Sequence, residues 1–192
     1  GVLNTLSALI LREDYLDLHF ATGLRGAHSW TPREGWMALV EGRWEDHDPA
    51  RDEVSSDSPG TRFRPVLPTD EGTWTSLSAG IAFPTPWPYL RGEAGLLTGR
   101  FRGEEFGALT GTGTFRQTRR GRGVELTGEV RAGVLMGSPP VQAHYFLGGR
   151  ETVPGHPFRS QAGDRFWLVE GEASRALLPP WVRLRAFATA GR

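Results

Sequence analysis

Apolar and polar side chains alternate one by one along segments of this chain that are longer than the strands of most soluble proteins. Between Val124 and Met136 the even-numbered positions are apolar or glycine, whereas the odd-numbered positions begin with Glu125, Thr127 and Glu129. Successive side chains of a strand point to opposite faces of a sheet, so this period predicts a strand with one apolar face. No segment keeps apolar residues at helical spacing between capping residues, and we therefore predict an all-β chain.

The same alternation recurs in about eight segments, most of which are about 11 to 14 residues long or longer. Strands of soluble proteins average ~5 to 6 residues, whereas a tilted strand that crosses a membrane needs ~9 to 11. The lengths therefore favour an antiparallel transmembrane β-barrel over a soluble β-sandwich. The predicted strands are Leu11–Ala27, Trp36–Asp46, Thr73–Phe83, Tyr89–Phe101, Glu105–Thr118, Gly123–Met136, Arg165–Leu177 and Trp181–Gly191.

The connections between these segments alternate between two kinds. Membrane barrels have short turns on one side of the membrane and longer loops on the other, and the same alternation is expected here. The short set is 28–35, 84–88, 119–122 and 178–180, and the other set is 47–72, 102–104 and 137–164. Two members of the second set exceed about 25 residues, a length that often marks a functional loop.

Aromatic residues gather near the ends of the predicted strands. Tryptophan and tyrosine prefer the membrane interface, because the ring is apolar while its N–H or O–H stays hydrated. The alternative is that these rings fill the core of a soluble sandwich. The residues are Trp30, Trp36, Trp44, Trp74, Trp87, Tyr89, Trp167 and Trp181.

Composition excludes several function classes. The 22 basic residues, all arginine, balance 22 acidic ones, and no clustered basic face supports a nucleic-acid partner. The chain has no cysteine, and no apolar run is long enough for a transmembrane helix. The acidic stretch that contains Asp46, His47, Asp48, Asp52, Glu53 and Asp57 lacks the spacing of an EF-hand, so a solvated loop is preferred to a metal site.

Two segments near the end of the chain carry a family resemblance. The first reads Tyr-Phe-Leu-Gly-Gly-Arg-Glu-Thr-Val-Pro-Gly-His-Pro-Phe over 145–158, followed by Gly163 and Asp164; the second reads Phe-Ala-Thr-Ala-Gly over 187–191. Over about 125–191 the chain resembles the C-terminal barrel of the Omp85 superfamily, the outer-membrane assembly and two-partner-secretion proteins that share a bacterial surface antigen domain. Upstream of residue 125 only the rhythm of the strands agrees.

The resemblance implies a barrel of sixteen strands in which 137–164 is the sixth surface loop and folds into the lumen. Residues 1–192 would then be a single β-barrel domain covering about strands six to thirteen. Earlier strands, periplasmic domains and the last three strands would lie outside this segment. The implied function is to help insert or translocate other polypeptides at the outer membrane of a Gram-negative-type bacterium. The implied partners are the lipid bilayer and client polypeptides, with no catalysis and no cofactor.

The resemblance also implies a set of site residues. The loop motif comprises Leu147, Gly148, Gly149, Thr152, Val153, Pro154, Gly155, His156 and Phe158. Pro154 stands where the family has an arginine, and Thr189 stands where it has an aspartate, so a cation and one of its acceptors are both absent. In the family model the loop arginine pairs with carboxylates of the barrel wall. Here Arg150 or Arg159 could supply the cation, with Glu170 or Glu172 as the acceptor.

Two other functions remain open. The chain could be a passive membrane anchor or pore for a separate domain, in keeping with the altered loop motif. It could also be a soluble β-sandwich or small closed barrel that binds a ligand. In the soluble alternative the apolar side chains would point inward, whereas in the membrane alternatives they would point outward.

Overall fold

Eight long strands form one antiparallel sheet in the computed structural model, which describes residues 19–49, 69–119, 123–149, 152–179 and 181–192. Each strand pairs with the strand before it, in the order β1-β2-β3-β4-β5-β6-β9-β10. The strands are β1 (His19–Trp30), β2 (Met37–Pro49), β3 (Gly72–Pro84), β4 (Leu90–Phe101), β5 (Glu104–Arg119), β6 (Val124–Gly137), β9 (Arg165–Leu178) and β10 (Val182–Gly191). The prediction of an all-β, antiparallel chain is confirmed.

Most strand ends lie within three residues of the predicted ends. The first predicted strand begins at Leu11, but residues 11–18 lie outside the described part, and the structure describes β1 from His19. The prediction missed the structure inside the long connection 138–164, which contains a 3-10 turn, η2 (Val141–Ala143), and a small hairpin, β7 (Tyr145–Leu147) and β8 (Gln161–Gly163).

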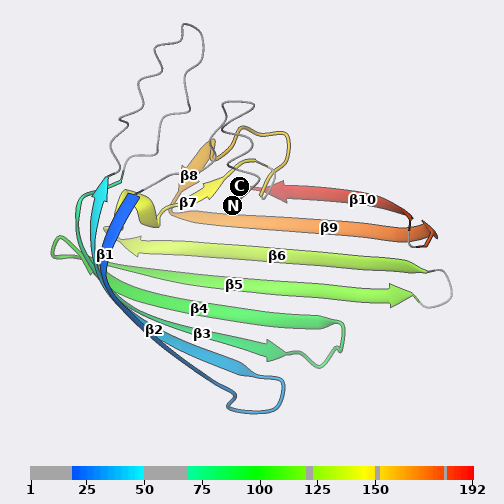
Figure 1. Ribbon diagram of the computed structural model, residues 1–192, viewed down its shortest axis with the longest axis horizontal. Coiled ribbons are helices and arrows are strands. Elements are labelled where there is room, and N and C mark those ends of the chain that lie inside the picture. Colours follow the sequence, from blue (N-terminus) through cyan, green and yellow to red (C-terminus); the bar gives the residue numbers. More distant parts are fainter. Residues whose placement is uncertain (1–18, 50–68, 120–122, 150–151, 180) are drawn as a thin grey trace, which may run out of the picture.

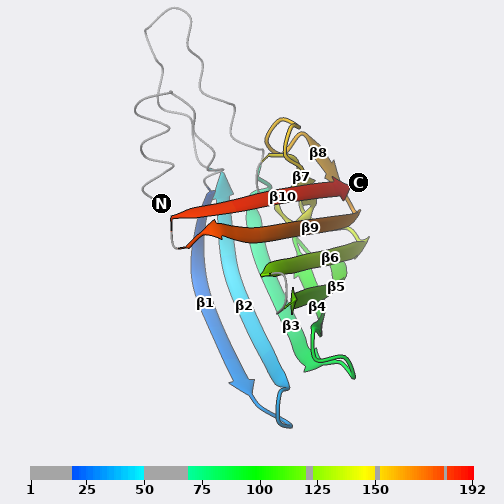
Figure 2. The ribbon, with the colours of Figure 1, turned by 90° about the vertical axis from the view of Figure 1, so that its right-hand side faces the viewer.

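The sheet curls into an open trough (Figure 1), and in Figure 2 the strands at its two ends run in very different directions. This curl reflects the right-handed twist of adjacent strands, which accumulates across a sheet. Within the described residues β1 pairs only with β2 and β10 only with β9, so the sheet does not close into a barrel. Among these residues no helix has the length and apolar character needed to cross a membrane.

The two faces of the sheet differ in chemistry. The concave face carries the loop 138–164 and most of the polar residues, and the opposite, outer face is apolar. Large apolar side chains are exposed on the outer face of every strand: Phe20, Leu24, Trp30, Trp44, Leu77, Leu96, Leu109, Val130, Met136, Trp167, Val169 and Leu184. Charged outward positions of the described strands lie toward the strand ends, as at Arg100, Glu105, Arg165 and Arg175.

The core is small and lies on the concave face, beneath the start of the loop. Trp74, Phe101 and Phe106 are at most 8% exposed, and Trp74 contacts each of the two phenylalanine rings edge to face. Trp74 therefore does not belong to an outward aromatic belt, as its position near a strand end had suggested. The register explains the difference, because Trp74 pairs with Phe101 and shares its concave face.

Candidate functional site: the loop on the concave face

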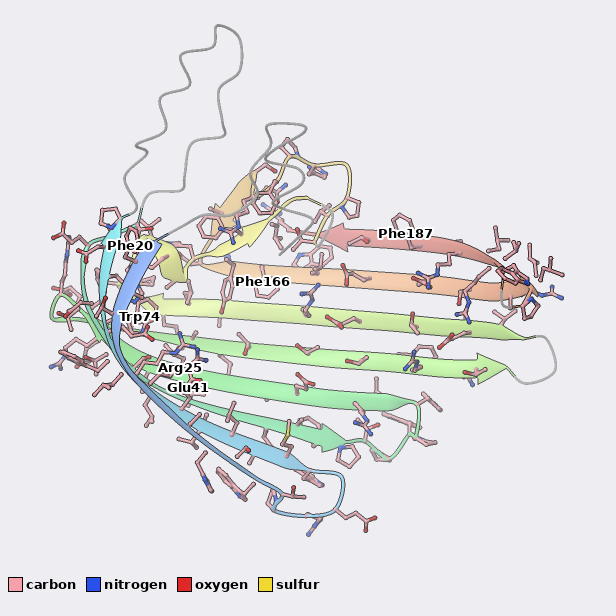
Figure 3. The ribbon with its side chains drawn as sticks, viewed as in Figure 1. Phe20, Arg25, Glu41, Trp74, Phe166 and Phe187 are labelled. Carbon is pink, nitrogen blue, oxygen red and sulfur yellow. The ribbon has the colours of Figure 1, made fainter. Side chains whose placement is uncertain are left out.

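The loop 138–164 leaves β6, crosses the concave face and returns to β9 (Figures 1 and 3). Its first part packs on the core, where Ala143 of η2 lies against the cluster of Trp74, Phe101 and Phe106. The backbone N–H of Leu135 in β6 donates to the carbonyl of Asp164 at the other end of the loop. Both ends of the loop are thus tied to the wall.

Tyr145 fixes the next part of the loop, because its ring lies over Gly133 of β6, which has no side chain. Its ring centroid is 4.5 Å from that of Phe166 in β9, and a Cβ atom at Gly133 would lie 2.8 Å from the Tyr145 hydroxyl. Burial raises the pKa of the Tyr145 phenol. The hydroxyl has no hydrogen-bond partner among the described residues, so the contact with the wall is one of shape.

The Leu-Gly-Gly part of the motif has a clear structural reason. Leu147 is 5% exposed, and the chain then turns through Gly148 and Gly149 with φ of +117° and +90°, values that favour glycine. A Cβ at Gly148 would collide with the Pro157 carbonyl oxygen, and one at Gly149 would lie 2.8 Å from the Phe158 ring. The returning part of the loop, at 157–158, therefore passes directly over the two glycines.

Hydrogen bonds close the tip of the loop on itself. The Gly148 N–H donates to Thr152 Oγ1 at 2.8 Å, and the Gly149 N–H donates to the His156 carbonyl at 3.1 Å. The His156 N–H donates in turn to the Val153 carbonyl at 3.2 Å. Gly155 takes a φ of +91° within this turn. The motif residues thus form one compact tip.

The tip of the loop reaches the wall at β10. Val153 Cγ2 lies 3.4 Å from the place that a Cβ of Gly191 would occupy. Pro154 and Thr189 line the same hollow. The sequence could only suggest that these two residues are related, and the structure places them together. The other lining residues of the hollow include Thr127, Glu129, Glu170, Glu172 and Phe187.

Arginines of the wall contact the glutamates of this hollow. Glu129 and Glu170 are directly opposite in the β6–β9 register, and like charges so placed repel one another. Arg131 lies between them, with Nε 2.7 Å from Glu129 Oε1 and Nη2 3.3 Å from Glu170 Oε2. Arg185 Nε is 3.6 Å from Glu172 Oε1. Sequence reasoning missed both roles, although the alternation already placed Arg131 on the polar face.

The structure describes one of the two loop arginines that are predicted to supply a cation. Arg159 lies over the rings of Phe146 and Phe158, at 5.5 and 5.2 Å from their centroids. Such stacking is favourable for a guanidinium. Arg150 lies outside the described residues, so its pairing stays a prediction.

A second charged cluster lies on the concave face at the other end of the sheet, on β1 and β2 (Figure 3). Glu41 is 7% exposed, and its Oε2 accepts hydrogen bonds from Arg25 Nε at 2.8 Å and Nη2 at 2.6 Å. Arg43 Nε donates to Oε1 of the same carboxylate at 2.5 Å. The alternation places the three residues on polar faces, and nothing else in the sequence predicts this cluster.

In the described part of the chain, no three metal-ligating side chains are placed to hold an ion. Asp52, Glu53 and Asp57 of the acidic stretch lie outside that part.

In comparisons with known proteins, no family model matches the chain and no curated protein is similar to it.

Proposed function

We propose that this chain is part of the wall of an outer-membrane β-barrel of the Omp85 type, which helps other polypeptides to insert into or cross the outer membrane. The observation that carries the proposal is the exposed apolar outer face, on which Leu77, Leu96 and Leu109 are 50–55% exposed. The family resemblance of the loop motif and of 187–191 supplies the finer assignment. On this proposal the eight strands are half of a sixteen-stranded barrel.

The distribution of polarity supports a lipid environment for the outer face. Exposed apolar surface is unfavourable in water, and monomeric soluble proteins rarely expose patches beyond a few hundred Å². In a membrane barrel the lipid side is apolar and the lumen is polar and hydrated. A soluble sandwich would instead bury such residues between two sheets. The eight long strands form one sheet with most of its exposed large apolar side chains on the outer face, whereas Met37, Leu39 and Phe187 are exposed on the concave face.

The loop gives the barrel a partial plug. Its tip sits on the polar wall around Glu170, Glu172 and Thr189, where it narrows the lumen. Glu170 and Glu172 have arginine partners on the neighbouring strands, Arg131 of β6 and Arg185 of β10, so the loop can rest there without a cation at Pro154. Client polypeptides would be handled by the barrel through binding and not through covalent chemistry.

A second function, a passive anchor or pore, is favoured by one observation. Pro154 and Thr189 remove a charged pair from the contact between loop and wall, which leaves a tip held by shape and by backbone turns. A loop that is held more weakly would open more readily. The two functions share the fold and differ in whether the barrel acts on clients.

Neighbouring leucines on β4 provide a matched test of the membrane proposal. Leu96 points outward and Leu97 points to the concave face. Because the chain has no cysteine, Leu96→Cys and Leu97→Cys can each carry one environment-sensitive dye. In phosphatidylcholine vesicles the dye at 96 should be quenched by brominated lipid and the dye at 97 by iodide. Equal quenching at both positions by iodide alone would rule out a lipid-facing wall.

The client function needs a separate measurement. An unfolded outer-membrane protein of eight strands is added to vesicles that contain the chain, and its folding is followed by gel mobility. We expect faster folding than in empty vesicles. A rate equal to that in vesicles with an unrelated barrel, together with correct dye quenching, would reject client handling and leave the passive anchor.

A further inference from the structure

The root of the loop is joined to a residue that is distant in sequence. Asp70 lies just before β3, and the Val141 N–H of η2 donates to its Oδ2 at 2.8 Å. The Asp70 N–H donates to Gln142 Oε1 at 3.0 Å, and Gln142 Nε2 donates to the Asp70 carbonyl at 3.1 Å. The two residues are 72 positions apart. Three hydrogen bonds thus meet on one aspartate.

The geometry of this contact is reciprocal. The side-chain amide of Gln142 pairs with both backbone groups of Asp70, as one strand pairs with another, while the Asp70 carboxylate accepts from the backbone beside Gln142. Gln142 Nε2 also lies 3.5 Å from Nδ1 of His47, a residue 6% exposed at the end of β2. A hydrogen bond to a charged acceptor is worth more than a neutral one, so the carboxylate strengthens the contact.

The position of the contact between Asp70 and Gln142 allows it to support the loop. η2 immediately precedes Tyr145, whose ring holds the loop on Gly133, and it packs on the Trp74 cluster through Ala143. Displacement of η2 would therefore weaken the support of the part of the loop that directly follows it. Asp70 approaches η2 from the connection between β2 and β3, which is a different connection at the same end of the sheet.

We propose that Asp70 and Gln142 form a latch that holds the loop 138–164 over the concave face and makes its position depend on the segment before β3. A partner that draws Asp70 away from η2 would release the loop, so the neighbouring connection can control access to the concave face. The latch goes beyond the proposed function, and its test reads the position of the loop and not the folding of a client.

The test uses a single introduced thiol. Leu147, which belongs to β7 of the loop, is 5% exposed, so we expect a Leu147→Cys thiol to react with a maleimide faster when the loop leaves the wall. When opening and closing are fast, the labelling rate follows the population of the open form. The full chain is measured in detergent micelles, and circular dichroism checks its strand content. Gln142→Ala in this background should raise the labelling rate about tenfold, because it removes two hydrogen bonds.

Two further variants make the result decisive. Asp70→Ala removes the carboxylate acceptor and should raise the rate roughly three- to tenfold. Gln117→Ala makes the same chemical change as Gln142→Ala on the outer face of β5 and should leave the rate unchanged. If both latch variants label at the rate of Gln117→Ala, the latch does not hold the loop. If Gln142→Ala loses its strand content, Asp70→Ala alone decides by the same comparison.

Discussion

Arg25 and Glu41 face one another across the pair of strands at one edge of the sheet, with Arg25 Nη2 2.6 Å from Glu41 Oε2. Arg43 occupies the other oxygen of the same carboxylate, and Arg25 and Arg43 are themselves opposite residues in the register. Two like charges so placed would repel one another. Glu41 therefore bridges two arginines that would otherwise separate the edge strand β1 from β2.

Glu41→Gln should lower the free energy of unfolding by about 1–3 kcal/mol, because it removes charge-assisted hydrogen bonds and leaves the arginines opposed. Urea unfolding in micelles measures the change. Glu105→Gln is the control, since its pair with Arg100 is largely exposed and such pairs are worth about 1 kcal/mol or less. Equal losses in the two variants would show that the bridge adds nothing at the edge.

Gly133→Ala tests the contact between Tyr145 and the wall. The new Cβ would lie 2.6 Å from the Phe166 ring and 2.8 Å from the Tyr145 ring, so one ring must move. Overpacking of this kind costs about 1–3 kcal/mol. Gly113→Ala, where no atom lies within 4 Å, should be close to neutral. Urea unfolding measures the stability of both variants, and near-ultraviolet circular dichroism reports the environment of their aromatic rings. If Gly133→Ala matches the unaltered chain in both measurements, the Tyr145 ring does not rest on Gly133.

The outer face should reject a charge that the concave face accepts. Leu109 points outward and Thr110 inward at neighbouring positions of β5. In a bilayer Leu109→Arg should cost about 2–4 kcal/mol if the residue lies near the midplane, whereas Thr110→Arg should cost much less. The yield of urea-resistant protein in vesicles reports the difference. Equal yields would contradict a lipid-facing outer surface.

Tyr145 predicts a loss of stability at alkaline pH. Burial raises the pKa of its phenol in the folded state, so the neutral form is favoured there. This contribution is fully present below the unfolded pKa of about 10 and is lost as the pH rises through the folded pKa. The chain has no lysine and three tyrosines, so few other groups titrate in this range. Unfolding at about pH 8 and pH 11 should therefore show a smaller loss for Tyr145→Phe than for the unaltered chain.

The hollow around Pro154 should accept a cation. Pro154→Arg would bring a guanidinium to a wall that holds three glutamates, and Thr189→Asp would add a further acceptor. We expect slower labelling of Leu147→Cys in the double variant than in either single variant, and an effect that weakens with salt. Adding Glu172→Gln to the double variant should reduce this slowing of the labelling. If the effects of the two single variants on the labelling rate simply add and do not depend on salt, the result argues against an ion pair between loop and wall.

The strands could be predicted from the sequence because their signal is local. The alternation from Val124 to Met136 states which side chains share a face, and the structure places them so. The partners of the charged residues could not be predicted, because they depend on register across a long connection. Arg131 reaches Glu170 because the β6–β9 register places Glu170 opposite Glu129, and Asp70 meets Gln142 from another connection. Trp74 was misplaced for the same reason, since its neighbours set its face.

The connectivity of the sheet also sets the order in which it can assemble. Turns of two to six residues join β1 to β2, β3 to β6 in succession, and β9 to β10, whereas 50–71 and 138–164 separate these three units. Hairpins with short turns form in about 1–10 μs, while longer connections impose a larger closure entropy. Asp70 and Gln142 belong to the two long connections. Asp70 directly precedes β3 and Gln142 follows β6, so their contact joins the two ends of the β3–β6 unit and can form before the other two units dock.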